Sequence, residues 1–399
     1  MSRCRVLFFV MLIVLVSAGA LPCDAQQGLP SAADNQSGLA ALPGTKNQKQ
    51  PLDRYNDVAL YIAGMKVSEK SDLYSLTKNP TWQHYASVTS DTWSSFTKTK
   101  IRKIADWAQA EIPDINRDCR TLFYPFSGPD FLYAHSFFPH ADTYILLGLE
   151  PVGTIPEPEK LQGDKLGSFF RMLDKSISDA LTLSFFRTND MADDINHQLI
   201  AGTTPVLMLF LARTGNQIVD IRFFDPDDNG TITYRDACRD TNGKRTLARG
   251  AEFIFRGKGD ERLRRLIYLS ADISDKGLAQ RGNVRAFLDR LEYGLSTYVK
   301  SASYLMHKNY FSNIRSCILK KSSAVVQDDS AIPYRFFDKG TWDIRLYGVY
   351  TAPIDLFKVH LEKDLKEAYA RDSKKLGFRL GYANQSNVLV ARRISRPQP

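Results

Sequence analysis

The sequence lacks the short motifs that commonly bind nucleotides and metals. It has no P-loop, no Gly-x-Gly-x-x-Gly after a predicted strand, no His-Glu-x-x-His and no Cys-x-x-Cys. Each of these motifs places backbone amides or ligating side chains around a phosphate or a metal ion. Their absence argues against nucleotide-dependent chemistry and against a structural zinc site.

Long apolar runs are also scarce, and the one clear run lies near the N-terminus. Val6–Val16 is an unbroken apolar stretch of 11 residues, preceded by Arg3 and Arg5 and followed by small residues. A membrane-spanning helix needs about 20 apolar residues. The layout predicts a secretory signal peptide over residues 1–25. The mature chain is therefore expected to have no transmembrane segment and to be exported, to a periplasm or beyond.

Two details of the signal stay open in the sequence. Cleavage after Ala25 is preferred because Pro22 would end the apolar helix shortly before that point, and cleavage after Ala20 is the alternative. An uncleaved anchor and a lipoprotein modified at Cys23 are further alternatives. The residue before a lipoprotein cysteine is normally small, so Pro22 argues against the second of these.

The composition is that of an ordinary globular protein, with 43% hydrophobic and 24% charged residues, which excludes a disordered or collagen-like chain. There are 53 Lys and Arg against 44 Asp and Glu, a formal net charge of +9. This excess favours an anionic component of the cell envelope as a partner. The basic residues are interspersed with acidic ones, which argues against nucleic acid.

The chain divides into a linker and a folded body. Residues 26–52 are rich in Gly, Ala, Ser, Gln, Asn and Pro and predict a disordered linker. Residues 53–399 predict one large domain, with two lobes at 53–200 and 201–399 as an alternative. Of the five cysteines, three remain after cleavage at Ala25. These three are Cys119, Cys238 and Cys317. One disulfide is permitted among them, and the sequence does not select which two cysteines form it.

Hydrophobic periodicity predicts a fold that mixes helices and strands. Amphipathic helices are predicted near 91–111, 169–181, 284–305 and 357–368. Strands are predicted at 121–126, 143–150, 206–212, 217–224, 252–255, 266–269, 324–326, 342–350 and 387–391, with a hairpin at Thr214-Gly215-Asn216. Residues 121–150 predict a strand, a helix and a parallel strand. The fold class is α/β or α+β, a large mixed β-sheet packed by several amphipathic helices.

One twelve-residue segment matches a calcium-binding loop. Oxygen ligands fall at the required positions and a glycine allows the sharp turn at position 6, so the sequence predicts a calcium site. Its candidate ligands are Asp225, Asp227, Asn229, Thr231, Thr233 and Asp236. Two features differ from an EF-hand: position 12 is Asp rather than Glu, and the preceding segment is predicted as a strand. A polar β-hairpin turn is therefore the alternative.

Four further side chains are candidate acids and bases. Asp130 follows Ser127-Gly-Pro at the junction of a strand and a helix, where α/β proteins often bind ligands, and His135 lies a turn or so later. Glu150 and Asp329 follow two other predicted strands. A hydrolase of the glycosidase type needs two carboxylates across a cleft. The alternative for Asp130 is a helix cap, and for Asp329 a solvated turn.

Four segments resemble a family of exported bacterial proteins to which no activity is assigned. They are Phe123–Phe131, Ile145–Gly153, Lys300–His307 and Val325–Arg335. The resemblance implies a bacterial, extracytoplasmic setting and implies no mechanism. The sequence therefore predicts an exported envelope protein with a binding or scaffolding role. The alternative is a hydrolase that acts on an envelope or extracellular polymer.

Overall fold

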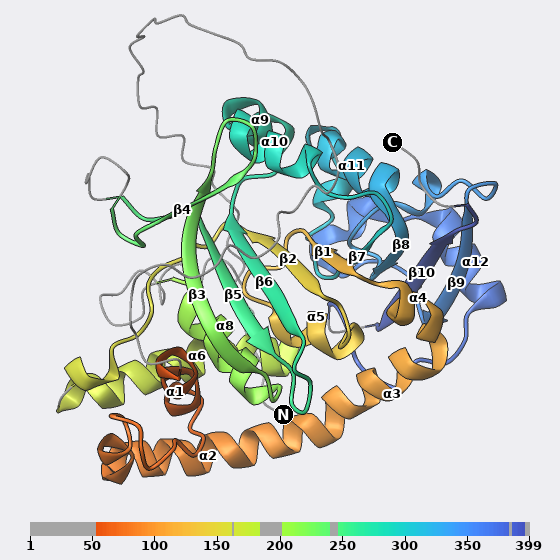
Figure 1. Cartoon of the computed structure of the whole chain (residues 1–399). Coiled ribbons are helices and arrows are strands. Elements are labelled where there is room, and N and C mark those ends of the chain that lie inside the picture. Colours follow the sequence, from red (N-terminus) through yellow and green to blue (C-terminus); the bar gives the residue numbers. More distant parts are fainter. Residues whose placement is uncertain (1–52, 162, 184–201, 240–245, 383–384, 396–399) are drawn as a thin grey trace, which may run out of the picture. The chain divides into compact units, whose positions relative to one another are not determined.

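The computed structural model describes residues 53–161, 163–183, 202–239, 246–382 and 385–395. The predicted signal peptide and the whole of the predicted linker lie outside these residues. The described part contains a ten-stranded sheet in the order β4-β3-β5-β6-β2-β1-β7-β8-β10-β9 (Figure 1). Helices pack around it, so the predicted fold class, a large mixed sheet packed by helices, is confirmed.

Five adjacent strands in the middle of the sheet are parallel. They are β1 (Thr121–Tyr124), β2 (Thr143–Gly148), β6 (Leu263–Ser270), β7 (Leu295–Val299) and β8 (Ser322–Gln327). β1 and β2 enclose α5 (Phe131–Phe137), which confirms the predicted strand–helix–strand unit with parallel pairing. Nearly every residue of these strands is buried or half-buried, as expected for parallel strands covered on both faces.

Antiparallel strands extend both sides of this parallel centre. β5 (Gly250–Arg256) pairs with β6, and β3 (Gln217–Pro226) and β4 (Ile232–Arg235) follow it outward. On the other side, β10 (Asn387–Arg393) pairs with β8, and β9 (Trp342–Gly348) forms the edge. Strands from the first and second halves of the chain thus belong to one sheet.

The helices differ in length and regularity. The first long one comprises α2 (Pro80–Phe96), a π-helical turn (Thr97–Ile101) and α3 (Arg102–Glu111). It begins at Pro80, where the Asn79 side chain accepts a hydrogen bond from the backbone amide of Thr81 at 2.8 Å. The other α-helices are α1 (Arg54–Ile62), α4 (Pro113–Asp118), α6 (Asp164–Leu183), α8 (Thr204–Arg213), α9 (Asp275–Gln280), α10 (Gly282–Asp289), α11 (Ser312–Lys321) and α12 (Lys363–Asp372).

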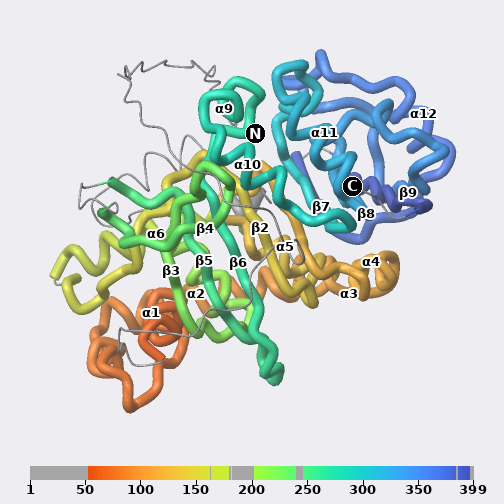
Figure 2. The backbone as a smooth tube through the Cα atoms, turned by 45° about the horizontal axis from the view of Figure 1, so that its top comes forward, coloured from red at the N-terminus to blue at the C-terminus, as the bar shows by residue number. Residues whose placement is uncertain are grey.

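Two groups of helices lie at different parts of the sheet. α1 contacts α8 and β3, whereas α12 contacts β9, and Figures 1 and 2 show the same separation. Short 3₁₀ segments complete the described part. They are η1 (Ser75–Lys78), η3 (Pro158–Lys160), η4 (Leu305–His307), η5 (Asn309–Phe311), η6 (Tyr334–Phe336) and η7 (Asp355–His360). Among the described residues, no helix has the length and apolar character needed to cross a bilayer.

Four of the predicted elements differ from the structure. The predicted helix over 284–305 ends at Asp289 as α10, and its second half forms β7 after Gly294. The predicted strand over 206–212 is α8 instead, so the predicted hairpin at 214–216 is the turn from α8 to β3. α8 and β7 are almost entirely buried, and the periodicity of a fully buried run does not distinguish a helix from a strand. The pattern over 357–368 also divides, into η7 and α12.

Candidate functional site

The order of the parallel strands reverses between β1 and β7. From β1 the chain builds outward through β2 and β6, and then returns to β7 and β8 on the other side of β1. The loops that leave the carboxyl ends of β1 and β7 therefore diverge. In α/β folds this divergence is where ligands bind. We call the residues that follow β1, β7 and β8 the switch-point site.

The backbone of this site is strained. Among the described non-glycine residues, positive φ angles occur at Phe126 (60°), Ser301 (51°), Ser303 (51°) and Tyr304 (54°), all just after β1 or β7. Each such conformation costs about 1–3 kcal/mol and persists only where its surroundings fix it. Strain of this kind is found preferentially at functional sites, which directs attention to these two loops.

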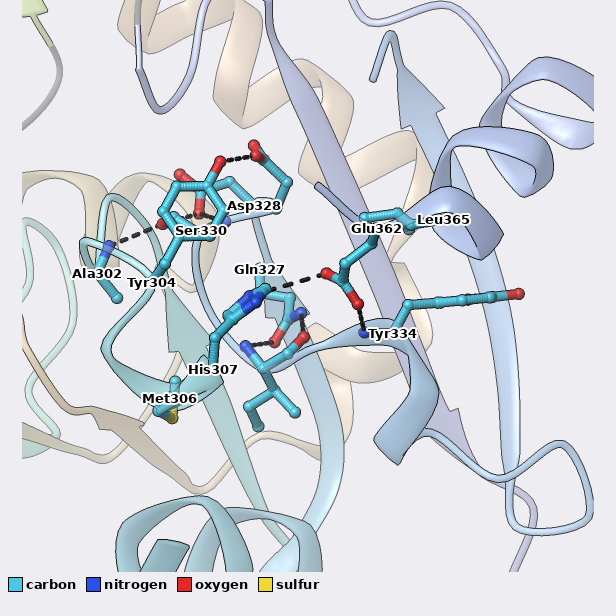
Figure 3. Close-up of polar contacts among 12 residues, drawn as sticks. Ala302, Tyr304, Met306, His307, Gln327, Asp328, Ser330, Tyr334, Glu362 and Leu365 are labelled. Carbon is cyan, nitrogen blue, oxygen red and sulfur yellow. Dashed lines mark hydrogen bonds and ion pairs between the residues drawn. The ribbon is translucent and has the colours of Figure 1, made fainter. Parts of the chain in front are cut away.

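Hydrogen bonds fix the loop after β7. The Ser301 amide donates to Asp328 Oδ2 at 2.8 Å, and the Ala302 amide donates to Ser330 Oγ at 2.8 Å. The Ser303 amide donates to the hydroxyl of Tyr382 at 3.0 Å. Residues after β8 and near β10 thus hold the strained loop in place, and Figure 3 shows the bond between Ala302 and Ser330.

Asp130 and Lys300 form a buried ion pair at the centre of the site. Their side chains are 1% and 2% exposed, and Lys300 Nζ lies 2.7 Å from Asp130 Oδ2. Asp130 also accepts hydrogen bonds from the Tyr124 hydroxyl at 2.9 Å and from the Tyr133 amide, which it caps at the start of α5, at 3.1 Å. Burial raises the pKa of Asp130 and Lys300 opposes that rise. Asp130 is therefore the helix cap that the sequence offered as the alternative, and both of its carboxylate oxygens have hydrogen-bonding partners.

A second lysine reaches the same aromatic ring from a different element. Lys100 lies in the π-helical turn, a distortion that often accompanies functional sites. Its Nζ is 5.6 Å from the centre of the Tyr133 ring, and Lys300 Nζ is 4.4 Å from that centre. Burial and the charges of Lys300 and Arg379 lower the pKa of Lys100 to about 8, while Asp130 opposes the shift.

Two adjacent carboxylates follow β8. Burial, with the neighbouring charge of Asp329, raises the pKa of Asp328 to about 7. Asp329 accepts hydrogen bonds from the Tyr304 hydroxyl and from Asn387 Nδ2, the latter at 2.8 Å. Asp329, one of the predicted acids, is thus part of the site through Tyr304.

His307 and Glu362 face each other beside Tyr304 (Figure 3). Their side chains are 4% and 6% exposed, and His307 Nε2 lies 3.7 Å from Glu362 Oε1. Burial raises the pKa of Glu362 to about 8, and burial with nearby His360 lowers the pKa of His307 to about 3. At neutral pH the pair is therefore a protonated carboxylic acid opposite a neutral imidazole. Glu362 Oε2 also accepts a hydrogen bond from the Tyr334 amide at 2.7 Å.

The structure brings the four predicted acids and bases only partly together. Asp130, Glu150 and Asp329 follow β1, β2 and β8, so all three lie at the carboxyl edge of the parallel strands. Glu150 is buried and accepts a hydrogen bond from the Tyr268 hydroxyl at 3.4 Å. It does not share the partners described above for Asp130 and Asp329. His135 lies within α5, 3.3 Å from Asn216 Nδ2, and burial lowers its pKa to about 3.

Sequence reasoning missed Lys100, Lys300, His307 and Glu362. Lys300 belonged to the predicted helix over 284–305, and Glu362 to the predicted helix over 357–368. The β-branched content of Leu295-Ser-Thr-Tyr-Val299 was the available signal for a strand that ends beside Lys300. No local pattern marks Lys100, because only the fold brings it to Tyr133.

The segment 225–236 forms the hairpin turn that the sequence left as the alternative to a calcium loop. β3 and β4 pair across it, and Asp227 Oδ1 accepts hydrogen bonds from the amides of Asn229 and Thr231. Gly230 has a φ of 77°, and a side chain there would collide with the backbone of α10 at 2.3 Å. Asp225 Oδ2 lies 2.5 Å from Arg235, and its other oxygen is 3.3 Å from Arg249.

Calcium binding stays a prediction, and a substitution tests it. Because two guanidinium groups hold the Asp225 carboxylate, we expect Asp225→Ala to lower the melting temperature equally in calcium and in chelator. Asp228→Ala, at an exposed neighbour, is the control. A loss confined to calcium-containing buffer would show instead that Asp225 ligates the ion. Within the described residues, no group of three His, Cys, Asp or Glu side chains is arranged around a metal position.

Cys119, Cys238 and Cys317, among which the sequence permits one disulfide, are free thiols in the structure. Burial raises the pKa of Cys119 to about 12 and that of Cys317 to about 11, so neither is a reactive thiolate at neutral pH.

Comparison with known proteins adds no relative, since no family profile and no curated protein matches the chain. The case for function therefore depends on the geometry of the switch-point site.

Proposed function

We propose that the protein is an exported binding protein of the bacterial cell envelope whose ligand carries an anionic group held at the switch-point site. The observation that carries the proposal is the convergence of Lys100 and Lys300 on the Tyr133 ring, where burial and, after it, the charges of Lys300 and Arg379 lower the pKa of Lys100. An anion bound there would offset this repulsion. Lysine and arginine are the side chains that bind carboxylate and phosphate groups in proteins.

Two features of the sequence support the compartment. Residues 1–25 have the layout of a secretory signal, and four segments resemble exported bacterial proteins. An envelope offers many polymers and lipids with phosphate or carboxylate groups. The formal net charge of +9 favours association with them.

Lys100→Gln tests the anion site, with Lys98→Gln in the same π-helical turn as the control. We expect Lys100→Gln to weaken the binding of inorganic phosphate or acetate by roughly tenfold or more, because it removes a charged hydrogen-bond donor. Lys98 is exposed, so its substitution should change affinity little. Isothermal titration calorimetry measures both affinities.

Proton uptake makes the same experiment more specific. At pH 8 Lys100 is partly neutral, so a bound anion should raise its pKa and draw a proton from the buffer. Titrations in buffers of different ionisation enthalpy should show this uptake in the wild type and its loss in Lys100→Gln. Equal weakening by both variants, or no binding of either anion, would refute the proposal.

A hydrolase that acts on an envelope or extracellular polymer is the second candidate. The observation that favours it is Glu362, whose pKa of about 8 keeps its proton at neutral pH, as a general acid requires. Asp329 lies in the same cluster through Tyr304. In that case Glu362→Gln should abolish turnover of a soluble envelope polysaccharide and leave phosphate binding unchanged.

A further inference from the structure

One arginine has buried donor atoms and no acidic partner. Arg213 is the last residue of α8 and is half-buried, and its Nε and Nη2 atoms are buried without a hydrogen-bond partner in the described part of the chain. Burial lowers the pKa of Arg213, and among the described groups only the Tyr85 hydroxyl opposes that shift. Because a buried charge without a counter-charge is strongly destabilising, its retention calls for a physical explanation.

The two nitrogens without partners form the edge of the guanidinium that binds carboxylates. The N–H bonds of Nε and Nη2 point in parallel from this edge, and they match the two oxygens of a carboxylate group. The Trp93 ring contacts the same guanidinium, with its centre 5.7 Å from Arg213 Cζ. A cation–π contact acts on the charge of the whole group and does not satisfy its N–H donors. The Trp93 contact therefore leaves this edge unsatisfied.

A second buried donor without a partner lies on α2. Tyr85, Thr89 and Trp93 are spaced by four residues and so follow one face of this helix. Thr89 Oγ1 is buried and has no hydrogen bond of acceptable geometry in the described part, although it is close enough to the Tyr85 hydroxyl to lower the pKa of that group. Tyr85 itself donates to the carbonyl of Ile62 at 2.6 Å. Arg213 also lowers the pKa of Tyr85, so Thr89 and Arg213 are neighbours of the same hydroxyl.

These donors lie between α2, α8 and the turn that follows α1. Arg213 Nη2 would be 3.4 Å from a Cβ atom at Gly64, which has a φ of 62°. In Figure 1 these helices lie at the end of the sheet away from α12. Thr89 precedes Lys100 by eleven residues in the same long helix, about 16 Å along its axis, so the place is distinct from the switch-point site. Asp174 on α6 affects the pKa of Tyr85 but not that of Arg213.

We propose that the Arg213 guanidinium and the Thr89 hydroxyl bind the carboxylate of a small organic acid, at what we call the carboxylate site. Each carboxylate oxygen accepts one N–H bond from the edge of the guanidinium, and one oxygen also accepts the proton of Thr89. The bound anion neutralises a buried charge and satisfies three donors at once. The proposal goes beyond anion binding at Lys100, because it adds a second ligand at a separate place.

Acetate is the probe for the carboxylate site, and every protein compared carries Lys100→Gln so that the switch-point site does not contribute. At constant ionic strength, acetate should raise the melting temperature of this parent protein. Adding Arg213→Met should abolish the shift, and adding Arg213→Lys should reduce it, because an ammonium group cannot donate two parallel N–H bonds. Arg222→Met is the control and should keep the full shift, since Arg222 is already paired with Asp220 at 2.6 Å.

Stability in acetate-free buffer gives a second readout, with opposite signs for the two arginines. Arg213→Met should raise the melting temperature there, because it removes a buried charge that nothing neutralises, whereas Arg222→Met should lower it by breaking an ion pair. Three results would each overturn the proposal. They are equal stabilisation of Arg213→Met and its parent by acetate, stabilisation of neither, and a lower melting temperature of Arg213→Met in acetate-free buffer. The last result would mean that water or the protein itself satisfies the guanidinium.

Discussion

Lys300→Ala is expected to lower the free energy of unfolding by about 3–5 kcal/mol, because it leaves the Asp130 carboxylate buried without its counter-charge. Asp130 and Lys300 are 1% and 2% exposed, so water cannot take the place of the lost ammonium group. Of the total stability of a typical domain, about 5–15 kcal/mol, this is a large part. Urea denaturation followed by circular dichroism measures the change.

Two controls accompany this prediction: one removes a lysine from an exposed position, and the other removes both charges of the buried pair. Lys320→Ala removes an exposed lysine from α11 and should change stability by less than about 1 kcal/mol. Asp130→Asn combined with Lys300→Ala should recover part of the loss, because the buried charge goes with its partner. If Lys300→Ala costs no more than Lys320→Ala, the pair is not the buried support of the site that its geometry describes.

The sequence was sufficient for the elements that alternate clearly or end at a strong boundary. The unit from β1 to β2 was predictable because Gly128-Pro129 separates a strand from a helix and both strands are rich in apolar residues. β3 was predictable from its β-branched and aromatic residues. α8 and β7 were not, because a run that is buried on every side gives the same apolar signal in either conformation.

The candidate site shows the same division. Asp130, Glu150 and Asp329 were found because each follows a strand, and strand ends meet at one edge of a parallel sheet. Their partners come from distant parts of the chain. Lys100 and Glu362 are brought in by packing, and no spacing in the sequence relates them to β1 or β8. The contacts that decide what each carboxylate does are tertiary, so only the fold reveals them.

Glu362→Gln is expected to stabilise the protein at alkaline pH and to leave its acid stability unchanged. The pKa of Glu362 is about 8 in the folded protein, against an ordinary value of 4.5. As pH rises from about 4.5 to 8, the unfolded chain releases a proton that the folded protein retains, so stability falls. Glutamine keeps the shape of the protonated acid without this penalty. At pH 8 the variant should exceed the wild type by about 4–5 kcal/mol, at about 1.4 kcal/mol per pKa unit.

His307 gives the opposite slope, and the two together define a profile. Its pKa is about 3 when folded, against an ordinary 6.5, so its contribution is lost as pH falls through that window. Between about 4.5 and 6.5 the two slopes cancel, and the pair contributes most to stability there. Above 6.5 only the Glu362 slope remains, and Glu362→Gln should remove it.

Urea denaturation across this pH range measures the difference between wild type and variant. Glu367→Gln, at an exposed position of α12, the helix that Glu362 precedes, is the matched control, and its stability should change with pH as that of the wild type does. Other carboxylates and histidines titrate in the same range, but they contribute equally to both proteins and cancel in the difference. Parallel curves for wild type and Glu362→Gln would mean that Glu362 is ionised in the folded protein. A buried anion 3.7 Å from His307 would then require a protonated imidazole, and the pair would be a salt bridge rather than a neutral acid and base.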